Sequence, residues 1–506
     1  MRAILLIISL LLCSIAHAVE SSPPSPATPG SWQVGFRVVE QSDASRSDNG
    51  EHAARPVQTL IWYPATQRGK ALRYEDYLEL GVAENDFSRT PAERRTRTDA
   101  SLRAYTVLGT TAGDMARWRD APVAASRDAS PASGRFPVVI YVASDSSPAF
   151  ENDWLCEYLA SHGYVVIASP SHGIDGGYMT DGRLPHDLAS TRAQAADIGF
   201  LIGYAGSLPF ADTTKLAVVG YSWGGMSGAF AAAADKRIRA IVEWDGSLRY
   251  FPRLLRAAPD IVAEDFTTPM LFIADREDPI VPARDAWPQS FVAHISHADL
   301  TLIGMKRLFH QDLSAQSLRL GSMAVHTDTT LAQRLESYAW MERYTLAFLD
   351  ERLKHDDTAR AFLDATSLQN HVPPGTLTVM RRHATSSSGN RADFAARLDA
   401  TNDDPMNVYR PYARQHPGFQ LANDTFSQWI SQLMATGDTA KASRVALLWT
   451  EVLPRSSEAW SSRATMEDMQ DMSEQAIRDY RRALRLDRGN ILAKRRLAAI
   501  TAAPGH

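Results

Sequence analysis

The sequence predicts an α/β protein, with a mostly parallel central sheet flanked by helices and an all-helical region at the C-terminus. Two observations predict this architecture. Between about residues 130 and 310, short apolar runs alternate with helical patterns, which is typical of βαβ units and a parallel sheet. Over roughly the last 80 residues the pattern is helical throughout and matches itself at a spacing of 34 residues.

Composition sets the broad class of the protein. The chain has 506 residues, of which 44% are hydrophobic and 22% charged, an ordinary globular balance in a chain long enough for more than one domain. The formal net charge is −5. This charge gives no electrostatic case for a nucleic-acid-binding protein or for a basic membrane-surface patch.

The first residues predict an export signal. Arg2 precedes an apolar run over residues 3–15, and Ala16-His17-Ala18 has the small-x-small form of a signal-peptidase site. The run is shorter than the ~20 residues that a membrane-spanning helix needs. We therefore expect residues 1–18 to be cleaved and the mature protein to be periplasmic or secreted; an uncleaved anchor is the alternative. Residues 19–31, rich in Ser and Pro, are expected to be a flexible lead-in.

Cysteine usage agrees with this expectation. Cleavage removes Cys13 and leaves Cys156 alone, so the mature chain forms no internal disulfide. Cys156 lies in the helical pattern "WLCEYLASHGY" and is expected to be a small buried apolar residue.

The expected α/β domain spans residues 32–365. It opens with two strand-like segments, "WQVGFRVVE" and "RPVQTLIWYPA". Residues 70–130 are charged and helix-leaning without a strong strand signal, and are expected to be an insertion. The core strands follow with helical segments between them, and a helix from about Leu331 to Lys354 closes the domain. The core strand runs are "FPVVIYVAS", "YVVIASPSHG", "KLAVVGYS", "IRAIVEWDG", "TPMLFIADRED" and "ADLTLIGM".

The remaining residues divide into a linker and a helical region. Residues 366–400 hold "HVPPG" and "TSSSGN" and are expected to be a linker. Residues 401–506 are helical, and their period resembles that of tetratricopeptide repeats, in which small residues let paired helices approach closely. An ordinary helical bundle is the alternative. The alanines that recur after 34 residues are Ala442 with Ala476 and Ala459 with Ala493.

A G-x-S-x-G motif, Gly220-Tyr221-Ser222-Trp223-Gly224, predicts a nucleophilic serine. It follows the strand-like run "LAVV" and opens the helical run "GGMSGAFAAAA", which is the strand–turn–helix setting that the motif requires. Five residues with three fixed are a weak signal alone, and an ordinary turn serine is the alternative. The context favours Ser222 as a nucleophile exposed above the sheet.

Serine needs a base to accept its proton, and this motif orders its partners as Ser, acid, His along the chain. His310 in "LIGMKRLFHQDLS" follows the last core strand by a short loop and is the favoured base. The other histidines near this position are His294, His297 and His326. Two aspartates follow strands and are candidate acids, Asp245 in "EWDG" and Asp278 in "DREDPIVP".

From about Trp32 to Lys354 the chain resembles an α/β-hydrolase, and within that fold the esterases related to platelet-activating-factor acetylhydrolase and dienelactone hydrolase. The segments that carry the resemblance are "IWYPA", "FPVVIYVAS", "YLASHGYVVIASPSHG", "GYSWGG", "WDG" and "FHQDL". The acetylhydrolase branch implies Ser222 as nucleophile, Asp245 as acid and His310 as base. Other α/β-hydrolases imply Asp278 as the acid, and Asp245 is favoured over this alternative.

The resemblance also implies an oxyanion hole made of two backbone N–H groups. One is that of Trp223, and the other comes from the loop after "VVIYVA", at about Asp145. Many relatives have His-Gly at this loop, whereas this chain has "ASDSS". His172 in "SPSHG" is expected at the same rim, with a structural role favoured over a role in the pocket.

The sequence therefore predicts an exported serine hydrolase that cleaves a carboxylic ester or related acyl bond of a small molecule. A peptidase or amidase with the same triad, and an idle hydrolase-fold scaffold that binds a protein partner through its helical repeats, are the alternatives. Residues 70–130 and 173–190 are expected to wall the substrate pocket. No cofactor or metal is expected, because the sequence has no H-E-x-x-H, Cys pair, P-loop or G-x-G-x-x-G after a strand.

Overall fold

A computed structural model describes residues 26–48, 53–104, 110–173, 188–256, 258, 260–276, 290–320, 328–384, 389, 391–416 and 418–502. The predicted signal peptide, Asp278 and His326 lie outside these residues.

One sheet of eleven strands organises the described α/β domain, in the order β11-β10-β9-β8-β7-β5-β6-β2-β1-β4-β3. Its strands are β1 (Gln33–Asp48), β2 (Ala53–Ala65), β3 (Lys70–Arg73), β4 (Pro122–Arg127), β5 (Phe136–Val142), β6 (Val165–Ser169), β7 (Ala211–Tyr221), β8 (Ile238–Trp244), β9 (Met270–Ala274), β10 (Leu300–Met305) and β11 (Leu377–Arg382).

The centre of the sheet is parallel. Strands β6, β5, β7, β8, β9 and β10 pair in parallel with their neighbours. They correspond to the six apolar runs of the sequence, which are continuous because both faces of the sheet are covered. At one side, the long antiparallel hairpin β1–β2 joins the sheet by pairing β2 with β6.

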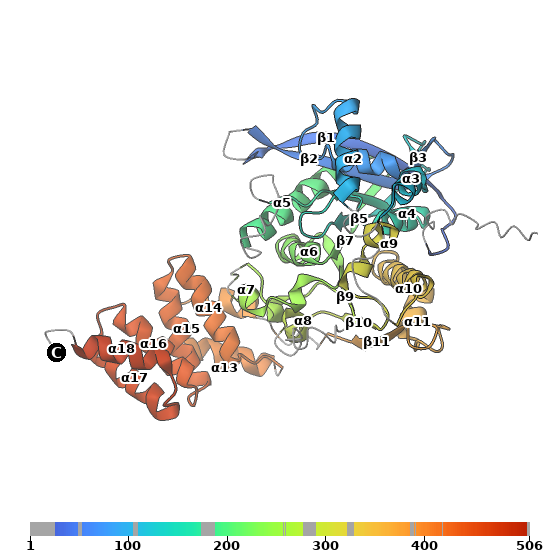
Figure 1. The fold of residues 1–506 in the computed structure, drawn as a ribbon. Coiled ribbons are helices and arrows are strands. Elements are labelled where there is room, and N and C mark those ends of the chain that lie inside the picture. Colours follow the sequence, from blue (N-terminus) through green and yellow to red (C-terminus); the bar gives the residue numbers. More distant parts are fainter. Residues whose placement is uncertain are drawn as a thin grey trace, which may run out of the picture.

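Helices cover both faces of this sheet and enclose two cores (Figure 1). Helices α4 (Asp153–Ser161), α9 (Ala315–Leu320) and α10 (Leu331–Leu349) pack on one face. Helices α5 (Leu188–Ala205) and α6 (Trp223–Ala234) pack on the other. Shorter turns of helix join the strands: η2 (Ser247–Arg249), α7 (Pro252–Arg256), η3 (Ala263–Asp265), α8 (Phe291–His294), η5 (His310–Leu313), η6 (Asp350–Lys354) and α11 (Asp357–Asp364). This is the α/β-hydrolase architecture that the sequence predicts.

Residues 70–130 are less separate from the sheet than expected. They hold α1 (Tyr74–Gly81), α2 (Pro91–Ala104) and α3 (Ala112–Asp120), but β3 and β4 add two strands beside β1. These strands are short and only partly buried, so they lack the apolar run that marks a core strand.

The prediction that residues 366–400 form a linker is wrong over two stretches. Strand β11 pairs antiparallel with β10 as an edge strand, and α12 (Arg391–Asp399) is helical. In "LTVMRR" only Leu377 is fully buried, because one side of an edge strand faces solvent.

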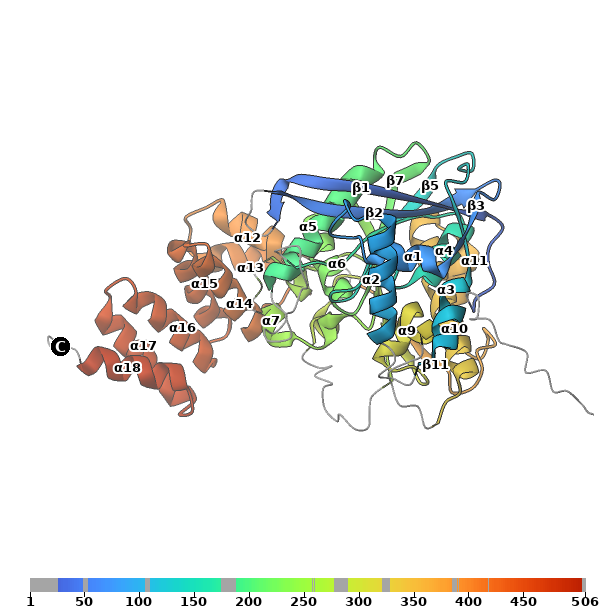
Figure 2. The same cartoon turned by 45° about the horizontal axis from the view of Figure 1, so that its top comes forward.

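The C-terminal residues form the expected helical region. Its helices are α13 (Pro405–Gln415), α14 (Asn423–Ala435), α15 (Thr439–Val452), α16 (Ser457–Asp468), α17 (Ser473–Leu486) and α18 (Ile491–Ala502). Helices α15 and α16 begin 34 residues before α17 and α18, and the four recurring alanines are fully buried between helices. The region extends from the α/β domain as an arm (Figures 1 and 2).

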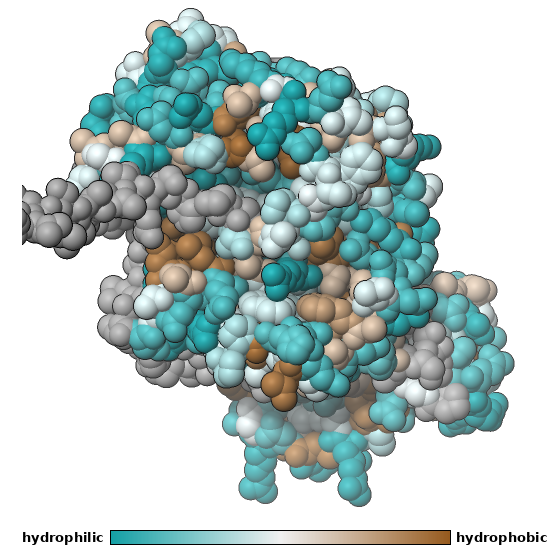
Figure 3. All heavy atoms as spheres, turned by 90° about the vertical axis from the view of Figure 1, so that its right-hand side faces the viewer, coloured by the Kyte–Doolittle hydropathy of each residue, from teal (hydrophilic) through white to brown (hydrophobic). Residues whose placement is uncertain are grey.

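The face of the molecule that carries α10 and α3 is mostly hydrophilic (Figure 3). Hydrophobic side chains show there as small separate groups among hydrophilic ones (Figure 3). Within the described residues, the apolar helices fall short of the length and hydropathy that a membrane crossing requires.

Candidate active site

Ser222 stands on a sharp turn between β7 and α6. Its backbone has φ 54° and ψ −119°, a conformation that costs a non-glycine residue about 1–3 kcal/mol and is found mainly at functional sites. The turn is held by its own backbone, because Ser222 N–H donates to the Trp244 carbonyl at 3.0 Å and the Ser222 carbonyl accepts from Ser247 N–H at 2.9 Å.

Glycine makes this turn possible. A Cβ on Gly224 would lie 2.2 Å from the Val142 carbonyl oxygen and 2.5 Å from that of Ala143. The first turn of α6 therefore rests directly on the end of β5, which brings the loop after β5 beside Ser222.

Three side chains from three loops form a hydrogen-bonded chain. His310 Nε2 lies 2.9 Å from Ser222 Oγ, and His310 Nδ1 lies 2.6 Å from Asp245 Oδ2. Asp245 directly follows β8 and has a positive φ of 45°, and His310 opens η5 after β10. Asp245 is fully buried, whereas one third of the His310 side chain is exposed.

Two residues close to Asp245 in the chain hold its carboxylate. Tyr250 O–H lies 2.8 Å from Oδ2 and 3.0 Å from Oδ1 of Asp245, and Arg249 lies 3.3 Å from Oδ1. A second carboxylate, Asp275, shares both partners, at 3.2 Å from Arg249 and 3.4 Å from Tyr250. The sequence analysis did not identify Arg249, Tyr250 or Asp275 as part of the site. The available signals were the position of Asp275 directly after β9 and the proximity of Arg249 and Tyr250 to Asp245.

Burial and charge shift the pKa values of these groups. Burial lowers the pKa of His310, but the hydrogen bond and charge of Asp245 outweigh it, so the pKa lies above its usual value. Burial and the charge of Asp245 raise the pKa of Asp275 to about 7 against the opposing charge of Arg249. Burial and the same two carboxylates raise the pKa of Tyr250, which keeps its O–H as a donor.

The loop after β5 holds the second expected oxyanion residue, Asp145. A buried carboxylate, Glu151, fixes its start by accepting from Ser144 N–H at 2.8 Å and from Ser144 Oγ at 2.6 Å. Trp223, the other expected residue, is the first residue of α6. The first N–H groups of a helix have no hydrogen-bond acceptor within the helix, and the helix dipole favours negative charge there.

Residues 70–130 support this loop. Phe150, which follows it, stacks on Tyr77 of α1 with ring centroids 5.7 Å apart, and Gly81 lets α1 approach the Phe150 ring. At the rim, His172 is buried with Nε2 3.1 Å from a Glu84 carboxylate oxygen, while Ser171 N–H donates to the Ser147 carbonyl. The segment 70–130 therefore braces the loop and reaches the rim through Glu84. Most of 173–190 lies outside the described residues.

Aromatic rings flank the three side chains. The Tyr221 ring lies 5.2 Å from that of His310, and Tyr221 O–H donates to the His310 carbonyl at 2.7 Å. Trp223 contacts Phe251 edge to face at 5.4 Å. These contacts fix the His310 backbone on one side and line the start of α6 on the other.

The other candidates lie elsewhere. His294 ends α8, where its Nδ1 lies 2.8 Å from the Ser290 carbonyl oxygen, and His297 lies in the loop before β10. The alternative acid Asp278 is outside the described residues. Among the described residues no group of three or more His, Cys, Asp or Glu is arranged to hold a metal ion. Cys156 is buried in α4.

Comparison with known proteins shows that part of this chain is similar to hydrolases. Residues 125–301 match the model of the dienelactone hydrolase family. The matched segment includes Ser222 and Asp245 and ends nine residues before His310. A Yersinia pestis protein provisionally named a carboxymethylenebutenolidase is 29% identical over 178 residues. That match covers 34% of this chain and 66% of the relative, just under two thirds of its length.

Among solved structures, a ferulic acid esterase from Streptomyces cinnamoneus is similar with a TM-score of 0.49 and 19% identity. The similarity covers 71% of this chain and 98% of that one. The family match confirms the resemblance of the central segment to dienelactone hydrolases of the α/β-hydrolase fold.

Proposed function

We propose that this protein is a serine hydrolase that cleaves a carboxylic ester or related acyl bond of a small molecule. One observation carries the proposal, the chain from Ser222 Oγ through His310 to Asp245, with contacts of 2.9 and 2.6 Å, on a strained turn at the end of a parallel strand. Acyl transfer by a serine requires a nucleophile, a base hydrogen-bonded to it, and an acid that orients the base. The hydrolase family that matches residues 125–301 supports the same chemistry.

In the first half-reaction, Ser222 Oγ attacks the carbonyl carbon of the substrate and its proton passes to His310 Nε2. The negative charge on the carbonyl oxygen is stabilised by the Trp223 N–H and by an N–H of the loop at Asp145. Asp245 holds His310 through Nδ1 and stabilises the imidazolium. The C–O bond then breaks, the leaving alkoxide takes the proton from His310, and an acyl group remains on Ser222.

In the second half-reaction, His310 removes a proton from water and the hydroxide attacks the acyl carbon. Collapse of the second tetrahedral intermediate returns the proton to Ser222 and releases the carboxylic acid. The role of Arg249 and Tyr250 in both steps is to hold Asp245 at one position while the charge on His310 changes.

The test is turnover of p-nitrophenyl acetate. Ser222→Ala removes the nucleophile and should lower kcat by about 10⁴-fold or more, because the members of a triad act as a unit. Ser227→Ala is the matched control, because Ser227 is a buried serine of α6, the helix that directly follows Ser222. Equal activity of the wild type and Ser222→Ala, with both folded, would refute the proposal.

We also propose that the protein is exported by cleavage after Ala18. The charged start, the apolar run and the Ala16-His17-Ala18 sequence support it. Expression of the full chain in a bacterium should give a periplasmic protein whose N-terminus is Val19. A full-length N-terminus on soluble protein in the cytoplasm would contradict export.

Helices α15 to α18 support a further proposal, two tetratricopeptide-like repeats. The two helix pairs recur after 34 residues with a buried alanine at each corresponding position. Replacing Ala459 by Leu should disrupt the packing of α16 against the hydrophobic cluster of α14 and α15 and lower the helix content measured by circular dichroism. The matched control is Ala498→Leu, at an exposed position of α18. Equal helix content in the two variants would contradict close packing at Ala459.

A further inference from the structure

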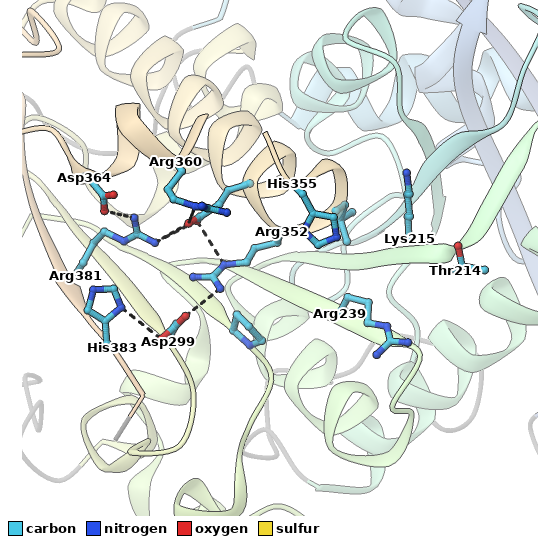
Figure 4. A pocket seen from close by; sticks show the side chains of 13 residues that line it. Thr214, Lys215, Arg239, Asp299, Arg352, His355, Arg360, Asp364, Arg381 and His383 are labelled. Atoms are coloured by element: carbon cyan, nitrogen blue, oxygen red, sulfur yellow. Dashed lines mark hydrogen bonds and ion pairs between the residues drawn. The ribbon is translucent and has the colours of Figure 1, made fainter. Parts of the chain in front are cut away.

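Two groups of polar side chains in the α/β domain differ in what they hold together. In a cavity lined by the starts of β7 and β8, Glu351 pairs with Arg381 at 3.0 Å and ties β11 to η6 (Figure 4). Ser222 follows the opposite end of β7. The second group lies between two loops of the candidate active site, the oxyanion loop (residues 143–152) and the histidine loop (residues 306–314).

Asn152 is the centre of this second group. It stands at the N-cap of α4, where an asparagine ordinarily accepts a hydrogen bond from its own helix, but its side chain does not cap α4. Its Oδ1 accepts from the N–H of Ala315 at 2.6 Å and from the O–H of Tyr338 at 2.9 Å, and its Nδ2 donates to the Tyr141 hydroxyl at 2.9 Å. The side chain is fully buried, and both of its polar atoms have partners.

The bond to Ala315 joins the ends of the two loops. Ala315 is the first residue of α9, which directly follows the histidine loop. The first N–H groups of α9 have no acceptor in their own helix, so Asn152 satisfies one of them from outside. A backbone hydrogen bond runs beside it, from the N–H of Gln316 to the carbonyl of Glu151 at 3.0 Å.

The same network reaches the start of the oxyanion loop. The Tyr141 hydroxyl, which accepts from Asn152, donates to Glu151 Oε2 at 3.4 Å. Glu151 in turn accepts from the N–H and Oγ of Ser144, directly before Asp145. A chain of buried hydrogen bonds thus runs from Ser144 to the start of α9.

In the proposed reaction the two loops act on the same carbonyl group. The oxyanion loop holds the carbonyl oxygen, while His310 moves protons to and from the other oxygen atoms at the same carbon. A misplacement of about 1 Å can cost about 100-fold in rate. A contact that fixes one loop against the other therefore affects the rate of the chemical step more than the binding of substrate.

We propose that Asn152 is a positioning residue, which fixes the oxyanion loop against the histidine loop in the geometry that acyl transfer needs. This inference rests on the proposed hydrolase function and deepens it. Among the described residues, Asn152 has no hydrogen bond to the three proposed catalytic side chains, and it acts through the two loops.

The test is the kinetics of p-nitrophenyl acetate turnover in Asn152→Leu, which removes the amide at similar size. Expressing kcat per active site, titrated with a fluorophosphonate probe, keeps unfolded protein out of the comparison. We expect kcat to fall tenfold or more and KM to stay within twofold. The acidic limb of the kcat/KM profile should stay in place, because Asp245 still holds His310.

A second variant breaks the same chain with a smaller change. Tyr141→Phe removes one oxygen between Glu151 and Asn152, and it tests the proposal even if Asn152→Leu does not fold. Its kcat should fall by a smaller factor. The double variant should be no slower than Asn152→Leu alone, because both changes break one chain of hydrogen bonds.

Two controls separate positioning from general stability. Asn370→Leu makes the same substitution at an amide that donates to the Tyr344 hydroxyl and the Phe362 carbonyl, outside both loops. Arg381→Leu breaks the ion pair with Glu351 (Figure 4). Both controls should lower the Tm and leave kcat per active site unchanged.

Several results would overturn the proposal. These are an unchanged kcat per active site in folded Asn152→Leu, a raised KM at constant kcat, additive losses in the double variant, or an equal fall of kcat in Asn370→Leu. A wild type that neither turns over the ester nor reacts with the probe would refute the hydrolase function itself, and the positioning role with it.

Discussion

Asp245 shows how a single residue is built for one task. It is fully buried, has a positive φ, and its carboxylate meets His310, Tyr250 and Arg249. A buried carboxylate of this kind needs partners for every oxygen, since an unpartnered buried charge is strongly unfavourable. The donors of Arg249 and Tyr250 hold the Asp245 carboxylate pointed at His310 Nδ1.

Removing the Tyr250 hydroxyl should therefore slow the reaction without weakening substrate binding. Tyr250→Phe takes one donor from both Asp245 oxygens, and a hydrogen bond to a charged group contributes about 1.5–3 kcal/mol. We expect kcat for p-nitrophenyl acetate to fall about tenfold or more with KM unchanged. Tyr63→Phe is the control, because it removes a buried tyrosine hydroxyl that donates to Ala129 away from the site. A raised KM at constant kcat would contradict a positioning role.

Asp275 should set the pH range of activity. The free enzyme needs an unprotonated His310, so kcat/KM rises with pH and levels off above the His310 pKa. The charge of Asp275 raises that pKa, so Asp275→Asn should lower it and move the acidic limb of the profile to lower pH. Asp260→Asn removes an exposed carboxylate elsewhere and should leave the limb in place. Movement of the limb to higher pH would contradict this account.

At the scale of elements, the start of α6 and the end of β8 are fitted around a buried carboxyl group. The Glu243 side chain is fully buried, and both of its oxygens are without a hydrogen-bond partner among the described residues. A Cβ on Gly225 would lie 2.2 Å, and one on Gly246 1.6 Å, from Glu243 Oε2. Both glycines make room for this side chain beneath the Ser222 turn.

Burial raises the pKa of Glu243 well above its usual value, so the folded protein binds this proton more tightly than the unfolded chain does. As pH rises above the unfolded value of 4.5, the unfolded chain releases this proton while the folded protein keeps it. The free energy of unfolding therefore falls as pH rises toward the folded pKa.

Glu243→Gln removes this pH dependence. Its Tm relative to the wild type should increase from pH 5 to pH 8, as measured by calorimetry, while Glu458→Gln on an exposed position should show no such trend. A constant difference in Tm across this range would mean that Glu243 is charged in the folded protein.

The elements also show what the sequence can and cannot predict. The core strands were predictable because each is a continuous apolar run covered on both faces. Strand β11 was not, because its exposed Met380 and two arginines resemble a loop, and its place depends on pairing with β10. Ser222 and His310 stand at positions set by local motifs. The contact of Asp275 with Arg249 depends on two neighbouring strand ends, and no local pattern encodes it. The catalytic role of these residues stays a prediction.

On the scale of the whole molecule, the α/β domain and the helical arm have separate cores. The arm encloses two hydrophobic clusters of its own, and polar contacts join it to the domain. Arg391 pairs with Asp265 at 2.9 Å, and Gln428 donates to the Ile261 carbonyl at 3.3 Å. A boundary of this kind is expected to let the two parts unfold separately.

A change in the core of the arm should therefore leave the domain intact. Ala476 is fully buried between α16 and α17, and Ala476→Met overpacks it, at a cost of about 1–3 kcal/mol. Calorimetry should show two transitions, of which only one shifts, and p-nitrophenyl acetate turnover should be unchanged. A single transition that shifts as a whole would show that the two parts unfold together.

The central claim is that Ser222 is the nucleophile of an acyl-transfer reaction. The most direct measurement is mass spectrometry of the protein after treatment with a fluorophosphonate probe, which phosphonylates only an activated serine. We predict one adduct, located on Ser222, which is absent in Ser222→Ala and forms much more slowly in His310→Ala. A folded wild type that stays unlabelled, or an adduct that persists in Ser222→Ala, would contradict the claim.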